Sequence, residues 1–219
     1  MSETTHQYGY ADARAREIST AQLVGQVLFL VAIALGFCAV GTLLGRDLAL
    51  GTARICSFAG EGGHEQHPEA GERFRVGAFA MGWLFATALL IGLGLGPVIA
   101  YFASVEEAAL TQAAAGTAAT VLGAGALGFA LSKDLARWMR PLALLVFAAC
   151  VFTIVLTLFG GTISPIVSLV IYGLSAALIV VDFTFLRQHG GEADAIWLAT
   201  GIFVSIVNIF VSLLNIFSR

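Results

Sequence analysis

Hydrophobic residues fill five long intervals of the chain that contain no charged side chain. An ionised side chain at the centre of a bilayer helix costs about 3 kcal/mol on insertion scales, so charges mark the ends of membrane spans. The fourth interval, from Arg140 to Asp182, is long enough for two passes, and Gly160-Gly161 followed by Pro165 provides a turn between them. The pattern therefore predicts six spans, at residues 20–44, 76–103, 109–131, 141–159, 164–186 and 195–217.

These spans are expected to be helices. A membrane strand would show about ten residues of alternating apolar and polar character, whereas these runs are apolar on every face. Helices also satisfy their own backbone hydrogen bonds in lipid. The predicted fold class is an all-α integral membrane protein with a six- or seven-helix transmembrane bundle. It forms one domain over residues 20–219, preceded by a polar N-terminal tail at residues 1–19.

The segment 46–75 interrupts the apolar pattern. It is either a polar loop or a poor membrane segment, because it combines a weakly apolar start with several histidines and glutamates. Six spans with the N-terminus outside and seven spans with the N-terminus inside place equal numbers of basic residues in the cytoplasm. Both topologies put the loops 132–140 and 187–194 in the cytoplasm, and the choice between them stays open here.

Composition supports solvation by lipid. Hydrophobic residues make up 58% of the 219 residues and charged residues only 11%, whereas soluble domains carry about 25% charged residues. The formal net charge of −3 offers no basic face for nucleic acid. No catalytic motif is present, so we expect no enzyme and no cofactor. The three cysteines form no metal-binding or disulfide pattern, and His64 and His67 with nearby glutamates are read as a solvated loop rather than a metal site.

Four segments resemble the Bax inhibitor-1 family, also called TMBIM, whose bacterial members are described as YccA-like. The run Ile202–Leu214 (IFVSIVNIFVSLL) resembles the family's last helix. Gly92–Tyr101 (GLGLGPVIAY) is similar to its glycine-rich third helix, and Thr117–Trp138 to its fourth helix and the following loop. Tyr172–Asp182 is similar to the sixth helix, which ends in an aspartate. The resemblance covers residues 76–219.

The resemblance implies a function in ion homeostasis. In similar family members, two facing aspartates share a proton and act as a pH-sensitive latch on a calcium leak. Here Asp182 matches one of them, but Ser205 stands at the other position, three residues before Asn208. A serine donates a hydrogen bond but contributes no charge. The resemblance therefore implies a leak for Ca²⁺ or other cations, or another role in ion homeostasis, with weakened pH gating and with Ca²⁺ or H⁺ as the expected ionic partners.

Asp182 stands out without reference to any family, because apolar residues flank it on both sides. At 1.5 Å per residue it lies about 12 Å before Gly190, and Ser205 lies about 16 Å after Asp194, so the two could meet across the last two helices. Asn208, one turn further on, could add a second donor. A carboxyl there must be paired, hydrated or protonated. The alternative to an ion pathway is an ion pair with Arg187, Arg73 or Arg75.

A second function is also open. Bacterial YccA-like relatives are associated with restraint of a membrane-bound protease, which implies a non-conducting protein with a membrane protein partner. The alanine- and glycine-rich composition favours a bacterial inner (plasma) membrane. Gly116, Thr120, Ala124 and Gly128 recur every four residues and predict close helix–helix contact.

Overall fold

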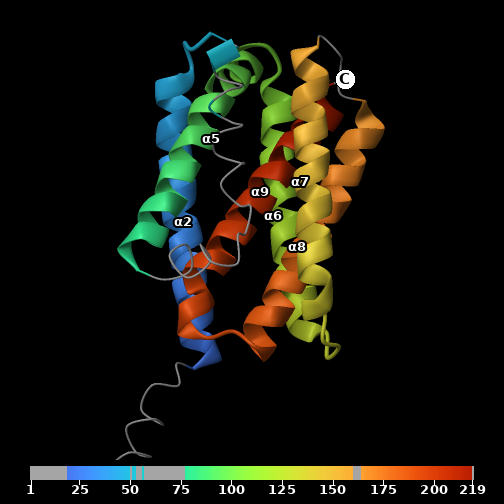
Figure 1. The fold of residues 1–219 in the computed structure, drawn as a ribbon. Helices are drawn as coiled ribbons and strands as arrows, with labels where there is room; N and C mark the ends of the chain where they lie inside the picture. The colour runs from blue at the N-terminus through green and yellow to red at the C-terminus, as the bar shows by residue number, and fades with distance from the viewer. Residues whose placement is uncertain (1–18, 50, 53–55, 57–76, 160–163, 219) are drawn as a thin grey trace, which may run out of the picture.

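The computed structural model describes residues 19–49, 51–52, 56, 77–159 and 164–218. Six long helices form a bundle in this part of the chain (Figure 1). They are α2 (Thr20–Gly45), α5 (Ala78–Val105), α6 (Glu107–Ala130), α7 (Ala136–Leu158), α8 (Pro165–Gln188) and α9 (Ala195–Phe217), with a short 3-10 turn, η2 (Glu192–Asp194), before α9. All six are long and apolar enough to cross a membrane. The described residues contain no strand, and the predicted fold class is confirmed.

The helix boundaries lie within a few residues of the predicted spans, except at the start of α7. This helix begins at Ala136, five residues before the predicted start at Pro141. The prediction followed the apolar run, but the helix continues through Arg137 and Arg140 beyond that run. Pro141 stands inside the helix, where it removes one backbone hydrogen bond.

Two helix starts follow from local capping. The Ser19 hydroxyl accepts a hydrogen bond from the Gln22 backbone N–H, and the Gln22 side chain accepts one from the Ser19 backbone N–H, which together form a capping box. At α8, the Ser164 hydroxyl accepts from the Val167 N–H at 3.4 Å. Pro165 follows at the first helical position, where its missing N–H costs nothing.

Helices α2 and α5 pack in parallel through facing glycines. A side chain at Gly92 would meet the backbone of Cys38, and one at Gly96 would meet the backbone of Gly45. The contacts therefore advance in the same direction along both helices. Two pairs of glycines four residues apart, Gly41 with Gly45 and Gly92 with Gly96, allow this backbone-to-backbone approach.

The parallel pair bears on the topology that the sequence left open. The six-span topology requires α2 and α5 to be antiparallel, and it places the N-terminus opposite the 187–194 loop. In the structure, the start of α2 and the loops 132–140 and 187–194 share one end of the bundle. Leu23 of α2 borders Gly190 in the second loop, and His189 in that loop contacts Asp134 in the first. The described helices thus have the arrangement of the seven-span topology. Residues 1–18 and most of the predicted polar segment 46–75 lie outside the described residues.

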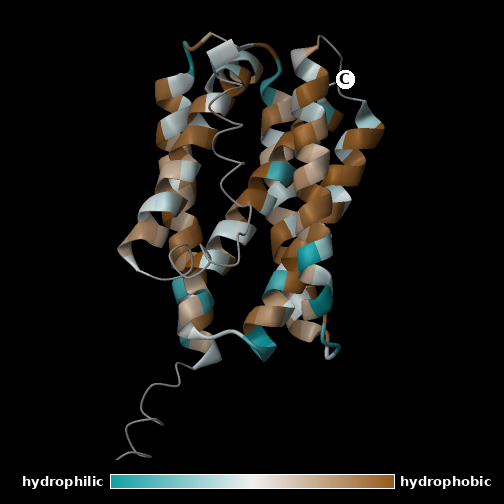
Figure 2. Cartoon of the chain, in the orientation of Figure 1, coloured by the Kyte–Doolittle hydropathy of each residue, from teal (hydrophilic) through white to brown (hydrophobic). Residues whose placement is uncertain are grey.

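Helix α9 lies at the centre of the bundle and packs against α2, α5, α6 and α8. More than half of its residues are buried, among them Phe203 and Ile209. Apolar colour dominates the six helices, and hydrophilic colour gathers toward their ends (Figure 2). The outer surface, with exposed residues such as Leu122 and Ile166, therefore has the character of a lipid-facing surface.

Candidate functional site

Asp182 lies in the interior of the bundle, on the side of α8 that faces α9. Its exposed fraction is 4%, and its Oδ2 atom is 3.5 Å from the position that a Cβ at Gly201 would occupy. The end of α8 at Gln188 is six positions further on, about 9 Å along the helix. The carboxyl therefore points into protein rather than into lipid.

Ser205 and Asn208 lie on the neighbouring part of α9, and both are buried. Among the described residues, neither the Ser205 hydroxyl nor Asp182 Oδ2 has a hydrogen-bond partner, so the expected bond between them is not formed. The Oδ1 atom of Asn208 accepts a weak hydrogen bond from Cys150 Sγ on α7 at 3.5 Å, and its Nδ2 has no partner among the described residues. The three predicted side chains thus lie along one helix interface without bonding to one another.

Arg187 does not pair with Asp182. Its Nη2 donates to the backbone carbonyl of Leu131 at the end of α6, and its Nε has no partner within the described part of the chain. The other two proposed partners, Arg73 and Arg75, lie outside the described residues. Among the residues described, Asp182 therefore has no compensating charge, and a buried carboxyl of this kind can take up a proton or attract a cation.

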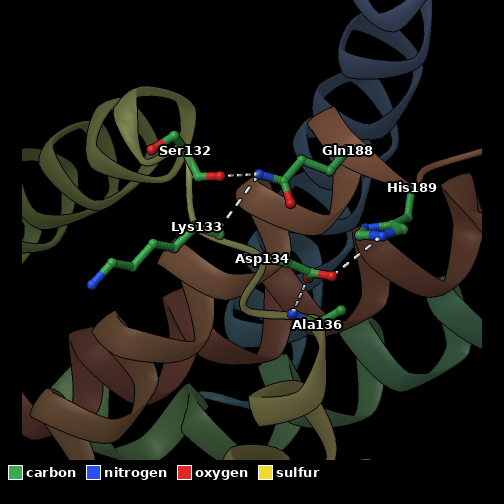
Figure 3. Close-up of polar contacts among 6 residues, drawn as sticks. All are labelled: Ser132, Lys133, Asp134, Ala136, Gln188 and His189. Atoms are coloured by element: carbon green, nitrogen blue, oxygen red, sulfur yellow. Dashed lines mark hydrogen bonds and ion pairs between the residues drawn. The ribbon is translucent and has the colours of Figure 1, made fainter.

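The end of α8 is attached to the loop between α6 and α7 (Figure 3). Besides the Arg187 contact, Gln188 Nε2 donates to the carbonyls of Ser132 and Lys133 at 3.4 and 3.5 Å. His189 Nε2 lies 3.5 Å from the Asp134 carboxylate, which also accepts a hydrogen bond from the Ala136 N–H. Three consecutive residues thus hold this loop, and the segment that carries Asp182 is fixed at its end.

Sequence reasoning missed three residues of this interface. Ser175 and Ser168 are buried on α8, and Gly201 faces the Asp182 carboxyl from α9. A signal for the serines was present, because Ser168, Ser175 and Asp182 are spaced by seven residues and share one helix face. Gly201 gave no such signal, since its role depends on which residue of α8 lies opposite.

The described residues contain no group of three or more histidine, cysteine, aspartate or glutamate side chains that could hold a metal ion. The loop histidines His64 and His67 lie outside this part of the chain. Within it, the candidate site consists of one carboxyl, with hydroxyl and amide groups nearby on α9.

Comparison with known proteins agrees with this architecture. A family model described as "Inhibitor of apoptosis-promoting Bax1" matches residues 20–219, a range that includes all six helices. No curated protein gives a match. Because the family model covers most of the chain, the resemblance seen in the sequence is confirmed. The chain belongs to the Bax inhibitor-1 family.

Proposed function

We propose that this membrane protein permits the passage of cations, as a Ca²⁺ or H⁺ leak that serves ion homeostasis, and that Asp182 is the ionisable group on the pathway. One observation carries the proposal: a carboxyl with an exposed fraction of 4% faces another helix and has no charge partner among the described residues. Intramembrane carboxyls are costly, so they persist where they serve ion or proton movement.

The charge distribution supports an orientation for this pathway. Four basic residues of the described part (Lys133, Arg137, Arg140 and Arg187) lie at the end of the bundle that carries the α6–α7 loop, and Arg46 lies at the other end. Basic residues favour the cytoplasmic side. We therefore propose that the end with the α6–α7 loop faces the cytoplasm and that the protein lies in a bacterial inner membrane. Asp182 is then nearer to the cytoplasmic side.

The test is Ca²⁺ flux into proteoliposomes at about pH 6 and about pH 8, for the wild type and for Asp182→Asn. Asparagine keeps the size of the side chain but cannot ionise. We expect the variant to lose about tenfold in flux, equivalent to about 1.4 kcal/mol in a barrier, together with the pH dependence of the wild type. That dependence should itself be modest, because Ser205 supplies no second charge.

Asp47→Asn is the matched control, because it makes the same chemical change at an exposed carboxylate at the other end of the bundle. Its flux should equal that of the wild type. If Asp182→Asn also conducts like the wild type, Asp182 is not the ionisable group on the pathway. If neither the wild type nor the variant conducts above protein-free liposomes, the leak itself is refuted. The protein would then fit the rival function, a non-conducting modulator of a membrane protease or another membrane complex.

A further inference from the structure

A line of buried polar side chains runs along α8 and ends at Asp182. Ser168 and Ser175 precede it by fourteen and seven residues, and Ser175 is fully enclosed, with an exposed fraction of 0%. Seven residues make almost two turns of an α-helix, so the three side chains follow one stripe. At 1.5 Å per residue the stripe covers about 21 Å, a large part of a bilayer's hydrocarbon thickness.

Helix α9 carries a second line of small and polar residues along one of its faces. Four of its residues recur at intervals of four, three and four, which places them on one helix face: Gly201, Ser205, Asn208 and Ser212. The last three are buried. Small and polar side chains thus line this face of α9.

The two lines face each other. Asp182 lies against Gly201, and α8 and α9 run in opposite directions as packed neighbours (Figure 1). Counting from that contact, Ser175 is level with Asn208, and Ser168 is level with the last turn of α9. We call this α8/α9 interface, from Asp182 to Ser168, the polar seam.

Several hydrogen-bonding groups in the polar seam lack partners among the described residues. Five buried side-chain nitrogen or oxygen atoms in the described part of the chain have none, and four of them lie in the seam: Ser175 Oγ, Asp182 Oδ2, Ser205 Oγ and Asn208 Nδ2. Buried polar groups in native proteins are bonded to protein or to ordered water. A series of such groups supplies the two to four polar partners that each buried water needs.

Charged side chains of the surrounding helices lie toward the helix ends. Within the described residues, the titratable groups of these helices are Cys38 on α2, Tyr101 on α5, Glu107 on α6, Arg137, Arg140 and Cys150 on α7, and Tyr172 and Arg187 on α8; α9 contributes none. Glu107 is the one carboxyl among them, and it lies in the first turn of α6. Among the described residues, Asp182 is therefore the one carboxyl in the seam, and a proton that enters the seam would bind there.

We infer that the polar seam is a hydrated proton pathway from the end of the bundle where α8 begins to the Asp182 carboxyl. A proton enters as hydronium, passes between water molecules by exchange of O–H bonds, and forms the neutral carboxyl at Asp182. This inference deepens the proposed function and rests on it for the role of Asp182. It adds the side of the membrane from which protons arrive.

Thiol hydrogen exchange tests the inference without any ion flux. One variant keeps a single thiol in the seam (Ser175→Cys with Cys38→Ala, Cys56→Ala and Cys150→Ala), and the control keeps only Cys38, which is buried at the α2/α5 interface. Infrared spectroscopy of the reconstituted proteins in D₂O follows conversion of S–H to S–D. We expect exchange at position 175 to be at least about tenfold faster than at Cys38, because the seam is hydrated in the native state while the control needs local opening.

Ser168→Val in the same single-thiol background tests the direction. The added apolar bulk should slow exchange at position 175 by about tenfold if protons enter where α8 begins. Unchanged exchange would overturn that direction. Equally slow exchange at position 175 and at Cys38 would overturn the pathway itself. Size-exclusion profiles and circular dichroism check folding, and Ser205→Cys replaces Ser175→Cys if the latter does not fold.

The outcomes separate this inference from the leak. Rapid thiol exchange together with flux that is insensitive to Asp182→Asn would support the hydrated seam and reject the role of Asp182 in the leak. Slow exchange together with flux that depends on Asp182 would reject the seam and support the leak.

Discussion

Two helix pairs in this bundle have small residues at their interfaces, but these residues have different roles in the two pairs. At the α2/α5 interface, Gly41, Gly45, Gly92 and Gly96 bring backbone against backbone, and no space is left for a side chain. At the polar seam between α8 and α9, Gly201 leaves ordinary van der Waals room beside the Asp182 carboxyl, and the small residues around it carry hydroxyl or amide groups. Small residues thus close one interface and leave the other polar.

The difference teaches that a small-residue stripe alone does not distinguish a packing site from a polar pathway. In lipid, close van der Waals contact drives helix association, and glycine pairs provide it. Buried hydroxyl and amide groups without protein partners oppose dry packing, because their desolvation is not compensated. What lies opposite each small residue therefore decides its role.

The largest expected effect comes from filling the α2/α5 interface. In Gly92→Ala, the new Cβ would overlap the Cys38 carbonyl oxygen, and its other near neighbours, Cys38 C and Cα at 2.9 and 3.0 Å, are also backbone atoms that cannot rotate away. We expect a loss of about 1–3 kcal/mol in stability, as for overpacked cores. Thermal unfolding in detergent measures it. Gly82→Ala on the same helix is the control, because nothing lies within 4 Å of its Cβ position.

A smaller effect, on flux rather than on folding, is expected from Ser205→Asp. A second carboxyl one helical turn after Gly201 would lie near Asp182, and repulsion would make the pair harder to ionise fully. The pH dependence of Ca²⁺ flux should become several-fold steeper than in the wild type, over the range from about pH 6 to about pH 8. Ser205→Asn is the neutral control. Identical pH profiles for the two variants would show that positions 182 and 205 do not interact.

The smallest effect on stability is expected from Gly201→Ala, the same substitution as at Gly92 but within the polar seam. Its Cβ would lie 3.5 Å from Asp182 Oδ2, an ordinary contact that requires no movement. The free energy of unfolding should change by less than about 0.5 kcal/mol. A loss as large as that of Gly92→Ala would mean that the two interfaces are equally tight, and the comparison would fail.

Much of the fold could be predicted from the sequence, because charged residues are excluded from the bilayer core and therefore mark each span. The close packing of α6 was also predicted, because its small residues recur every four positions and therefore share one helix face. A Cβ at Gly128 would lie 2.7 Å from the Val180 carbonyl oxygen, and Thr120 hydrogen-bonds to Tyr172 at 3.0 Å, so this stripe does pack closely against α8.

The direction of α2 relative to α5 could not be predicted, because counts of basic residues fitted both topologies equally well. The site was only partly foreseen. The apolar flanks of Asp182 marked it as an embedded carboxyl, but its orientation toward Gly201 depends on how α8 and α9 are aligned. Likewise, the attachment of Arg187 to Leu131 rather than to Asp182 depends on where α6 ends.

The central position of α9 has a consequence for biogenesis. The four helices that pack most extensively against α9, namely α2, α5, α6 and α8, all precede it in the chain, so the ribosome delivers each of them to the membrane before their common partner. Helices inserted one by one in this way reach their final packing only after insertion. Until α9 arrives, the face of α8 that carries Asp182 has no α9 to cover it. Cells that make this protein therefore expose an incomplete bundle during each round of translation, and membrane quality control has that interval in which to act.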